Sequence, residues 1–217
     1  MEVVVVMASV YRIPVNVTIE AVNSAMNCDA IQSVHVWGYD PTFKAKNHAL
    51  RTTLYHRALV KHQNALLTSV LKEGNKYHTV DDVNRILWRS KLALDMWQVL
   101  QSARKMFPTA LLVWLENDAI VDCTRLKKAV LLLTQTKSKA LSCWGNTPKY
   151  SSSGLLCFLF TPEACPERHL LAYHMVQPAD WIIAEYSNGT WPVFNAVQHG
   201  IDGRHKSTRL MHTKVFQ

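Results

Sequence analysis

Three polar side chains follow an unbroken run of apolar residues in the middle of this chain. Glu116, Asn117 and Asp118 come directly after six apolar residues at positions 110–115. A continuous apolar run between two helix-like stretches predicts a central strand buried on both faces of a parallel sheet. Open α/β sheets bind ligands at the carboxyl ends of their strands, and carboxylate and amide oxygens suit Mg²⁺ or Mn²⁺. The pattern favours a cation or ligand site here about equally with a plain acidic turn before a helix capped by Asp122.

The charge balance restricts the partners of the protein. Lys and Arg number 24 against 16 Asp and Glu, which gives a formal charge of +8. This excess predicts an anionic partner: nucleic acid, a membrane surface or a phosphorylated small molecule. The basic residues are scattered in pairs such as Arg104-Lys105 and form no run of five or six. We therefore expect a small phosphorylated ligand and no nucleic acid.

Hydrophobic residues make up 48% of the 217 positions and charged residues 18%, which excludes a disordered chain. The length suits one α/β domain over residues 1–217, and no linker divides it. No apolar segment reaches the roughly 20 residues of a membrane span, and the opening lacks the positive region of a signal peptide. These features predict a soluble or cytoplasmic chain, or a catalytic portion without its anchor.

The five cysteines lack zinc-site spacing, and their apolar neighbours predict buried free thiols.

The order of the expected elements indicates a nucleotide-binding layout. Residues 3–8 predict a buried strand, residues 15–27 a helix and residues 34–38 a second strand. This strand-helix-strand opening is typical of nucleotide-binding α/β folds. Neither a Gly-x-Gly-x-x-Gly nor a P-loop motif occurs, which argues against a dinucleotide oxidoreductase or a P-loop enzyme.

Further elements follow from periodicity and capping signals. We expect an amphipathic helix within residues 43–77, a long helix over 85–107 ended by Pro108, and a helix from Asp122 to about 136. Strands are expected near 140–144 and 155–160, and a strand-like run precedes residues 198–200. Thr161-Pro162 predicts the start of a short helix, and a last helix is expected over 182–186.

The long helix carries three charged residues on the side opposite its apolar face. These are Arg89, Lys91 and Asp95. One interpretation is a solvated face with a Lys91–Asp95 ion pair, worth only a few tenths of a kcal/mol. The other is a clamp for a diphosphate, sited just before the acidic strand end.

Five short motifs occur in one order along the chain and together resemble a known family. The series is similar to the N-acetylglucosaminyltransferase IV family and to the related enzyme that adds N-acetylgalactosamine to glycosylphosphatidylinositol anchors. The resemblance spans Ser9 to Ser207. The motifs are Ser9-Val10-Tyr11-Arg12, Trp88-Arg89-Ser90-Lys91 with Leu94-Asp95, Leu115-Glu116-Asn117-Asp118, Pro178-Ala179-Asp180-Trp181, and Gln198-His199 with Gly203, His205 and Ser207.

The resemblance implies a GT-A fold, with one mixed, mostly parallel sheet and helices on both sides. It implies a UDP-sugar donor, Mn²⁺ or Mg²⁺, and a glycan or glycolipid acceptor. The reaction implied is transfer of an N-acetylhexosamine to a hydroxyl with inversion at the anomeric carbon. It also implies a Golgi lumen, where the relatives work behind a membrane anchor.

The resemblance also assigns roles around the cation. Asp118 would hold the metal, and His199 would be its second protein ligand. Glu116 and Asn117 would meet the ribose or the donor sugar. Asn117 stands where the family has Asp, which removes one negative charge beside the metal. A catalytically weak protein that binds glycan or nucleotide-sugar with the same fold is therefore the alternative function.

The other roles concern the diphosphate and the acceptor. Arg12, Arg89 and Lys91 would contact the uridine diphosphate, and Asp95 would orient one of these basic groups or the uracil. Asp180 would be the general base that takes the proton of the acceptor hydroxyl. The alternative for Asp180 is a helix N-cap. A basic nucleic-acid-binding domain would leave the ordered acidic and His motifs unexplained.

Overall fold

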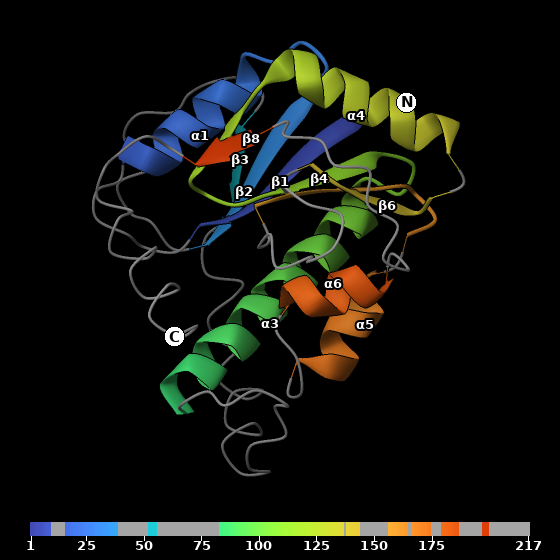
Figure 1. Ribbon diagram of the computed structural model, residues 1–217. Coiled ribbons are helices and arrows are strands. Elements are labelled where there is room, and N and C mark those ends of the chain that lie inside the picture. Colours follow the sequence, from blue (N-terminus) through green and yellow to red (C-terminus); the bar gives the residue numbers. More distant parts are fainter. Residues whose placement is uncertain are drawn as a thin grey trace, which may run out of the picture.

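A computed structural model describes the chain in residues 1–9, 16–38, 52–55, 83–136, 138–143, 156–164, 166–174, 179–186 and 197–199. Within these ranges the side chains of Ser9, Asn16, Val17, Gly38, 52–55, 83–88, Lys91, 184–185 and 197–199 are outside the description. The elements lie in a central sheet with helices on both faces (Figure 1).

Within the described residues, the main sheet has six strands in the order β3-β2-β1-β4-β7-β6. Neighbours from β3 to β4 pair in parallel, and β7 pairs antiparallel with both β4 and β6. The prediction of a mixed α/β sheet is confirmed. The strands are β1 (Val3–Ser9), β2 (Ser33–Gly38), β3 (Thr52–Tyr55), β4 (Leu111–Leu115), β6 (Ala140–Ser142) and β7 (Cys157–Phe160).

Helices cover both faces of this sheet. The helices are α1 (Asn16–Met26), α3 (Val83–Met106), α4 (Cys123–Gln135), α5 (Pro166–Tyr173) and α6 (Ala179–Tyr186). In Figure 1, α1 and α4 lie on one face of the sheet, and α3, α5 and α6 lie on the other. The helices predicted over 15–27, 85–107 and from Asp122 onward therefore form, with ends shifted by one or two residues.

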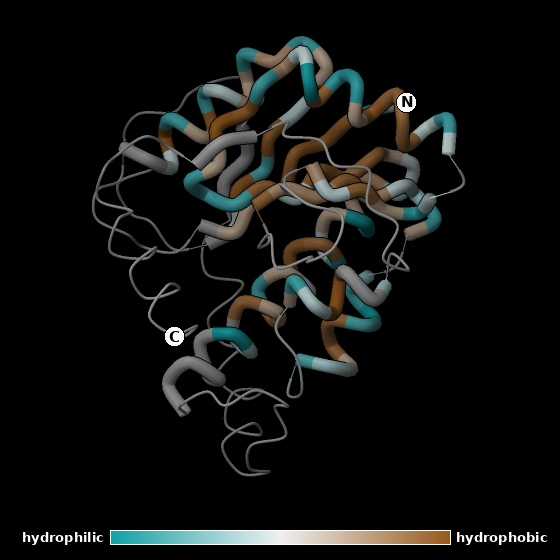
Figure 2. Tube along the Cα trace, in the orientation of Figure 1, coloured by the Kyte–Doolittle hydropathy of each residue, from teal (hydrophilic) through white to brown (hydrophobic). Residues whose placement is uncertain are grey.

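Alternation along the central strands explains why both faces are covered. Successive side chains of a strand point to opposite faces. In β1, Val5 packs into the core under α1 and α4, whereas Val4 packs into the core against α3, α5 and α6. Leu111 and Leu112 divide between the same two cores in β4. An unbroken apolar strand thus fills two cores at once, and the hydropathy colouring shows the brown strands enclosed by helices with teal outer faces (Figure 2).

One local expectation is wrong, and two short strands were not expected. Thr161 does not cap a helix: Ala164 N donates to Thr161 O at 3.0 Å in a tight turn, and α5 begins later, at Pro166. Pro is favoured at the second position of such a four-residue turn, so Thr161-Pro162 can begin a turn as readily as a helix. The unexpected strands are β3 and β5 (Ala119–Val121). The helix predicted within 43–77 falls outside the described residues.

The cysteine prediction is half right. Cys143 and Cys157 are buried free thiols, and burial raises the pKa of Cys143 well above its ordinary value. Cys28 and Cys123 instead form a disulfide between positions 95 residues apart in the sequence. Their apolar neighbours gave no sign of this pairing, because it depends on two helix ends that meet only in the fold. Among the described helices, none is long and apolar enough to cross a membrane.

Candidate functional site

The acidic motif forms a tight turn at the carboxyl end of β4. Ala119 N donates to Glu116 O at 3.1 Å, and this bond closes the turn between β4 and β5. Glu116 N donates to Leu156 O at 3.0 Å, which ties the turn to the residue before β7. Asn and Asp are favoured in such turns. The turn therefore places Asn117 and Asp118 at the edge where an open α/β sheet binds its ligands.

The side chains of this turn are mostly withdrawn from solvent. Asp118 is 5% exposed and Asn117 is 6% exposed, whereas Glu116 is half-buried. Burying a carboxylate is costly unless hydrogen bonds or a cation compensate it. A buried aspartate oxygen beside further oxygen donors is the donor chemistry that Mg²⁺ and Mn²⁺ prefer. The residues of the turn therefore fit a hard divalent cation.

Helix α1 holds this turn and the strand after it. Asn117 Nδ2 donates to Thr18 Oγ1 across 3.4 Å, within buried surroundings. Val121 N donates to Ser24 Oγ at 3.1 Å. Thr18 and Ser24 were missed in the sequence, because hydroxyls on a helix carry no signal of a partner about a hundred residues away. The Asn117 amide thus donates toward α1, whereas a carboxylate at this position could only accept a hydrogen bond from the Thr18 hydroxyl.

The strand β8 (Val197–His199) brings a distant segment beside the acidic turn. It pairs antiparallel with β5, in a register that sets His199 opposite Ala119 and Gln198 opposite Ile120. Ala119 directly follows Asp118. The backbone of His199 therefore lies next to the turn that carries Asp118, although the His199 side chain is outside the described part of the chain.

The predicted diphosphate clamp lies on a helix that is more buried than expected. Asp95 is only 4% exposed, and Arg89 is half-buried. The interpretation of a solvated face is wrong at Asp95, because its side chain is withdrawn from solvent. Lys91 lies in α3 with only its backbone described, and Arg12 falls outside the described residues.

Asp180 lies in the first turn of α6 and is partly exposed. The helix begins at Ala179, so Asp180 is inside it and not at the N-cap position. α6 packs against α3 and α5, on the face of the sheet opposite to α1. The carboxyl edge of the sheet borders both faces, so a residue on either face can lie near it. The role of Asp180 as general base stays a prediction.

A cluster of metal-type ligands lies elsewhere on α1 and α4. Among the described side chains, one group of three such residues has ligand atoms within 4.8 Å of one another: Cys28, Asp29 and Cys123. Its two sulfurs are joined in the disulfide, and the Asp29 carboxylate pairs with Lys127. A disulfide offers no thiolate, so this cluster is a crosslink and not a cation site.

Comparison with known proteins gives the fold. No protein-family model matches the chain, and no curated protein matches it. Among solved structures, mouse xyloside xylosyltransferase 1 in its apo form superposes with a TM-score of 0.53 at 9% identity, over 89% of this chain and 84% of that chain. A glycosyltransferase involved in the glycosylation of the major capsid of PBCV-1 gives 0.52 at 9%, over 99% and 100%.

A third match extends the range of chemistry that this fold supports. The structure of 4-diphosphocytidyl-2C-methyl-D-erythritol synthase superposes with a TM-score of 0.50 at 8% identity, over 96% of this chain and 97% of that chain. At such identities the likeness concerns the fold. The chain has a GT-A-like α/β fold, which these three structures share.

Proposed function

We propose that this protein is an inverting, cation-dependent glycosyltransferase that moves an N-acetylhexosamine from a UDP-sugar to a hydroxyl of a glycan or glycolipid. The observation that carries the proposal is the register of β5 and β8. It sets His199 opposite Ala119, the residue after Asp118, so the two proposed metal ligands come from β8 and from the turn that leads into its partner strand β5. The GT-A-like fold supports a nucleotide-sugar substrate, since both glycosyltransferases named above share it.

The cation would be held by Asp118 and His199, and it would neutralise the diphosphate that leaves with the donor. Asp118 is buried at the sheet edge, which limits competition from water for its carboxylate. Glu116 and Asn117 flank it and would meet the ribose or the donor sugar. Mn²⁺ accepts both carboxylate and imidazole ligands, so this donor set fits Mn²⁺ better than Mg²⁺.

The remaining residues of the chain would bind the diphosphate and move one proton. Arg12, Arg89 and Lys91 would pair with phosphate oxygens, and Asp95 would orient one of these basic groups or the uracil. The Asp180 carboxylate would take the proton of the acceptor hydroxyl as that oxygen attacks the anomeric carbon from the face opposite the diphosphate. The excess of positive charge, +8 overall, favours an anionic donor.

The first experiment measures UDP binding by calorimetry with and without Mn²⁺. Wild-type protein should bind UDP in a Mn²⁺-dependent manner, and Asp118→Ala should weaken this binding by about 100-fold or more, as expected for loss of a metal ligand. Glu167→Ala is the matched control, because this carboxylate lies in the first turn of α5, on the other face of the sheet from α1 and α4. Its variant should bind UDP normally. Absence of Mn²⁺-dependent UDP binding by the wild type would overturn the proposed function.

The second readout separates the enzyme from a binding protein. Wild-type protein with Mn²⁺ should hydrolyse or transfer sugar from a UDP-N-acetylhexosamine, whereas Asp180→Asn should bind UDP normally and lose transfer. Binding without turnover by the wild type would instead support a catalytically weak nucleotide-sugar-binding protein, the alternative to which the Asn117 substitution points. Normal transfer by Asp180→Asn would assign the base to another residue.

A further inference from the structure

Three links connect α1 to the segment that runs from the acidic turn to the start of α4. They occur in the same order along both segments. The first two are the Thr18–Asn117 and Ser24–Val121 contacts described above, and the third is the disulfide between Cys28 and Cys123. The segment 117–123 is thus fastened along the whole length of α1, with a covalent bond at the far end.

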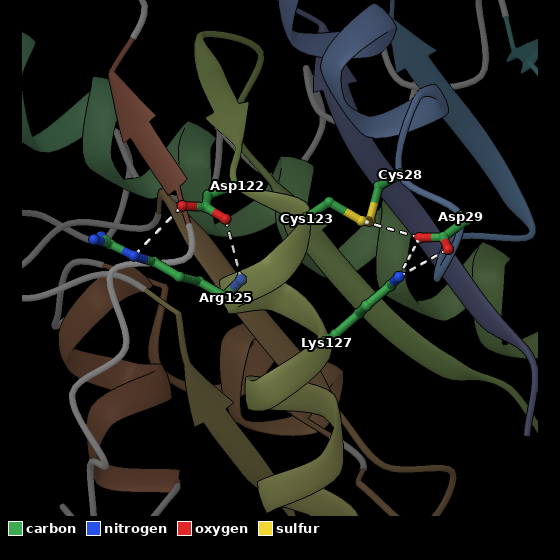
Figure 3. A network of polar contacts seen from close by, with 6 residues as sticks. All are labelled: Cys28, Asp29, Asp122, Cys123, Arg125 and Lys127. Atoms are coloured by element: carbon green, nitrogen blue, oxygen red, sulfur yellow. Dashed lines mark hydrogen bonds and ion pairs between the residues drawn. A yellow bond between two sulfur atoms is a disulfide. The ribbon is translucent and has the colours of Figure 1, made fainter.

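The covalent link joins the ends of two helices on one face of the sheet. Cys28 follows α1 and is fully buried, and Cys123 is the first residue of α4. Their Cα atoms lie 5.1 Å apart. Figure 3 shows the disulfide beside an ion pair that joins the same two helix ends, in which Lys127 Nζ lies 2.6 Å from Asp29 Oδ1. The hydrogen bond from Lys127 is the main cause of the lowered pKa of Asp29.

We propose that the Cys28–Cys123 disulfide is a positioning crosslink for the cation and donor site, which keeps the acidic turn in the arrangement that binds Mn²⁺ and UDP. This inference rests on the proposed function. Only β5, a strand of three residues, separates the turn from Asp122 and Cys123. So short a strand supplies few hydrogen bonds, and α1 provides the remaining support.

The physical reason is the precision that a cation requires. Metal ligands need to lie within a few tenths of an ångström of their bonding distances, and losing residues that hold ligands in place typically weakens metal binding by about 10- to 100-fold. A shift of β5 along α1 would move Asp118 relative to β8. The disulfide fixes the Cys123 end of this segment, and the Thr18 and Ser24 contacts then fix the positions between.

The crosslink forms by thiol–disulfide exchange with an oxidant, and a reductant breaks it. Formation joins the two cysteine sulfurs and releases two electrons and two protons to a disulfide oxidant such as oxidised glutathione, which becomes two thiols. Reduction by a phosphine and water reverses this: the S–S bond breaks, both cysteines become thiols and the phosphine becomes its oxide. The crosslink therefore forms where disulfide oxidants prevail.

The test compares Mn²⁺ and UDP dissociation constants of wild type and of the Cys28→Ser/Cys123→Ser variant, at a temperature where circular dichroism shows both folded. We expect Mn²⁺-dependent UDP binding to weaken about 10-fold in the variant. Two controls accompany it. Asp29→Asn removes the neighbouring ion pair and keeps the disulfide, and Leu133→Ala opens a cavity under α4 without touching α1. Both should bind normally, the second despite a lower melting temperature.

A parallel measurement needs no substitution at the crosslink. Wild-type protein reduced with a phosphine, and freed of it, should lose about the same affinity and regain it on re-oxidation with oxidised glutathione, whereas the double Ser variant should respond to neither treatment. Unchanged affinity in the double variant and in reduced wild type would overturn the positioning role. If the wild type itself fails to bind Mn²⁺ and UDP, the proposed function fails first, and thiol counting by mass spectrometry still tests whether the crosslink forms.

Discussion

The two faces of the sheet differ in a covalent link, which among the described residues lies on the face of α1 and α4. On that face, Cys28 is joined to Cys123, and hydrogen bonds connect Thr18 to Asn117 and Ser24 to Val121. On the face of α3, α5 and α6, the core buries large aromatic side chains, among them Trp37, Trp114 and Phe158, and the Arg104 guanidinium donates hydrogen bonds to Ala110 O and Thr161 O.

The difference corresponds to the roles proposed for each face. Directional links fix the distance between particular atoms, which a cation site requires, whereas apolar burial is non-directional and sets stability more than position. The face that carries the acidic turn has the disulfide. The face that carries Asp180 has a helix, α6, that buries Ala179, Ile182 and Ile183 in the core.

The largest expected effect comes from removing a buried apolar side chain of α6, which tests how far burial holds this helix. Ile183 is fully buried, and Ile183→Ala should lower the free energy of unfolding by about 2–5 kcal/mol because it leaves a cavity. Trp181, on the same helix, is 41% exposed, and Trp181→Ala should change it by only about 0.5 kcal/mol. Urea denaturation of both variants provides the measurement. Equal costs would show that α6 is not held by burial.

A smaller effect is expected where a single directional contact acts on the other face. Asp122 caps α4 by accepting a hydrogen bond from Arg125 N at 3.1 Å. Asp122→Ala should cost about 1 kcal/mol of unfolding free energy, the usual value of an N-cap. Arg125→Gln is its control: it removes only the Arg125–Asp122 ion pair, which is a surface pair of little value. A cost for Arg125→Gln as large as that for Asp122→Ala would contradict the capping role.

The smallest expected effect is on how the free energy of unfolding depends on pH, and it comes from His35 in β2. His35 is buried, with its ring centroid 4.6 Å from that of Phe107, and burial lowers its pKa below the ordinary value of about 6.5. The unfolded chain therefore takes up a proton before the folded one does. Stability should be fully present above about pH 6.5 and decline as the pH falls toward the folded pKa.

Comparing wild type with His35→Leu by urea denaturation from pH 8 to pH 5 tests this sign, with about half-unit steps to locate the decline near the ordinary pKa. The substitution should flatten the decline, because the titrating group is gone. A decline of the same slope in both proteins would assign the pH dependence to other groups.

Much of the fold was predictable because its signals are local. The apolar runs at 3–8 and 110–115 indicated strands buried on both faces, and both belong to the sheet interior. Asp122 was recognisable as a cap from its position before an amphipathic helix, and the structure confirms it. The helix expected at Thr161 was wrong, since a capping pair alone does not reveal that the chain first turns.

The site was predictable only in part. The acidic turn followed from its place at the end of an apolar run, whereas the roles of Arg12, Lys91, His199 and Asp180 came from resemblance and stay predictions. The burial of Asp95 was not foreseen, because the spacing of residues on one helix does not show what packs over its polar side.

The sequence by itself determined the long helices and the central strands, since hydrophobic periodicity and capping act between residues a few positions apart. Only the tertiary structure decided that α1 meets the segment 117–123, that β8 pairs with β5, and that Cys28 joins Cys123. Each of these contacts links residues about eighty to a hundred positions apart, and no local pattern specifies such a partner: it is set by which helices and strands pack together to bury the two apolar faces of one sheet.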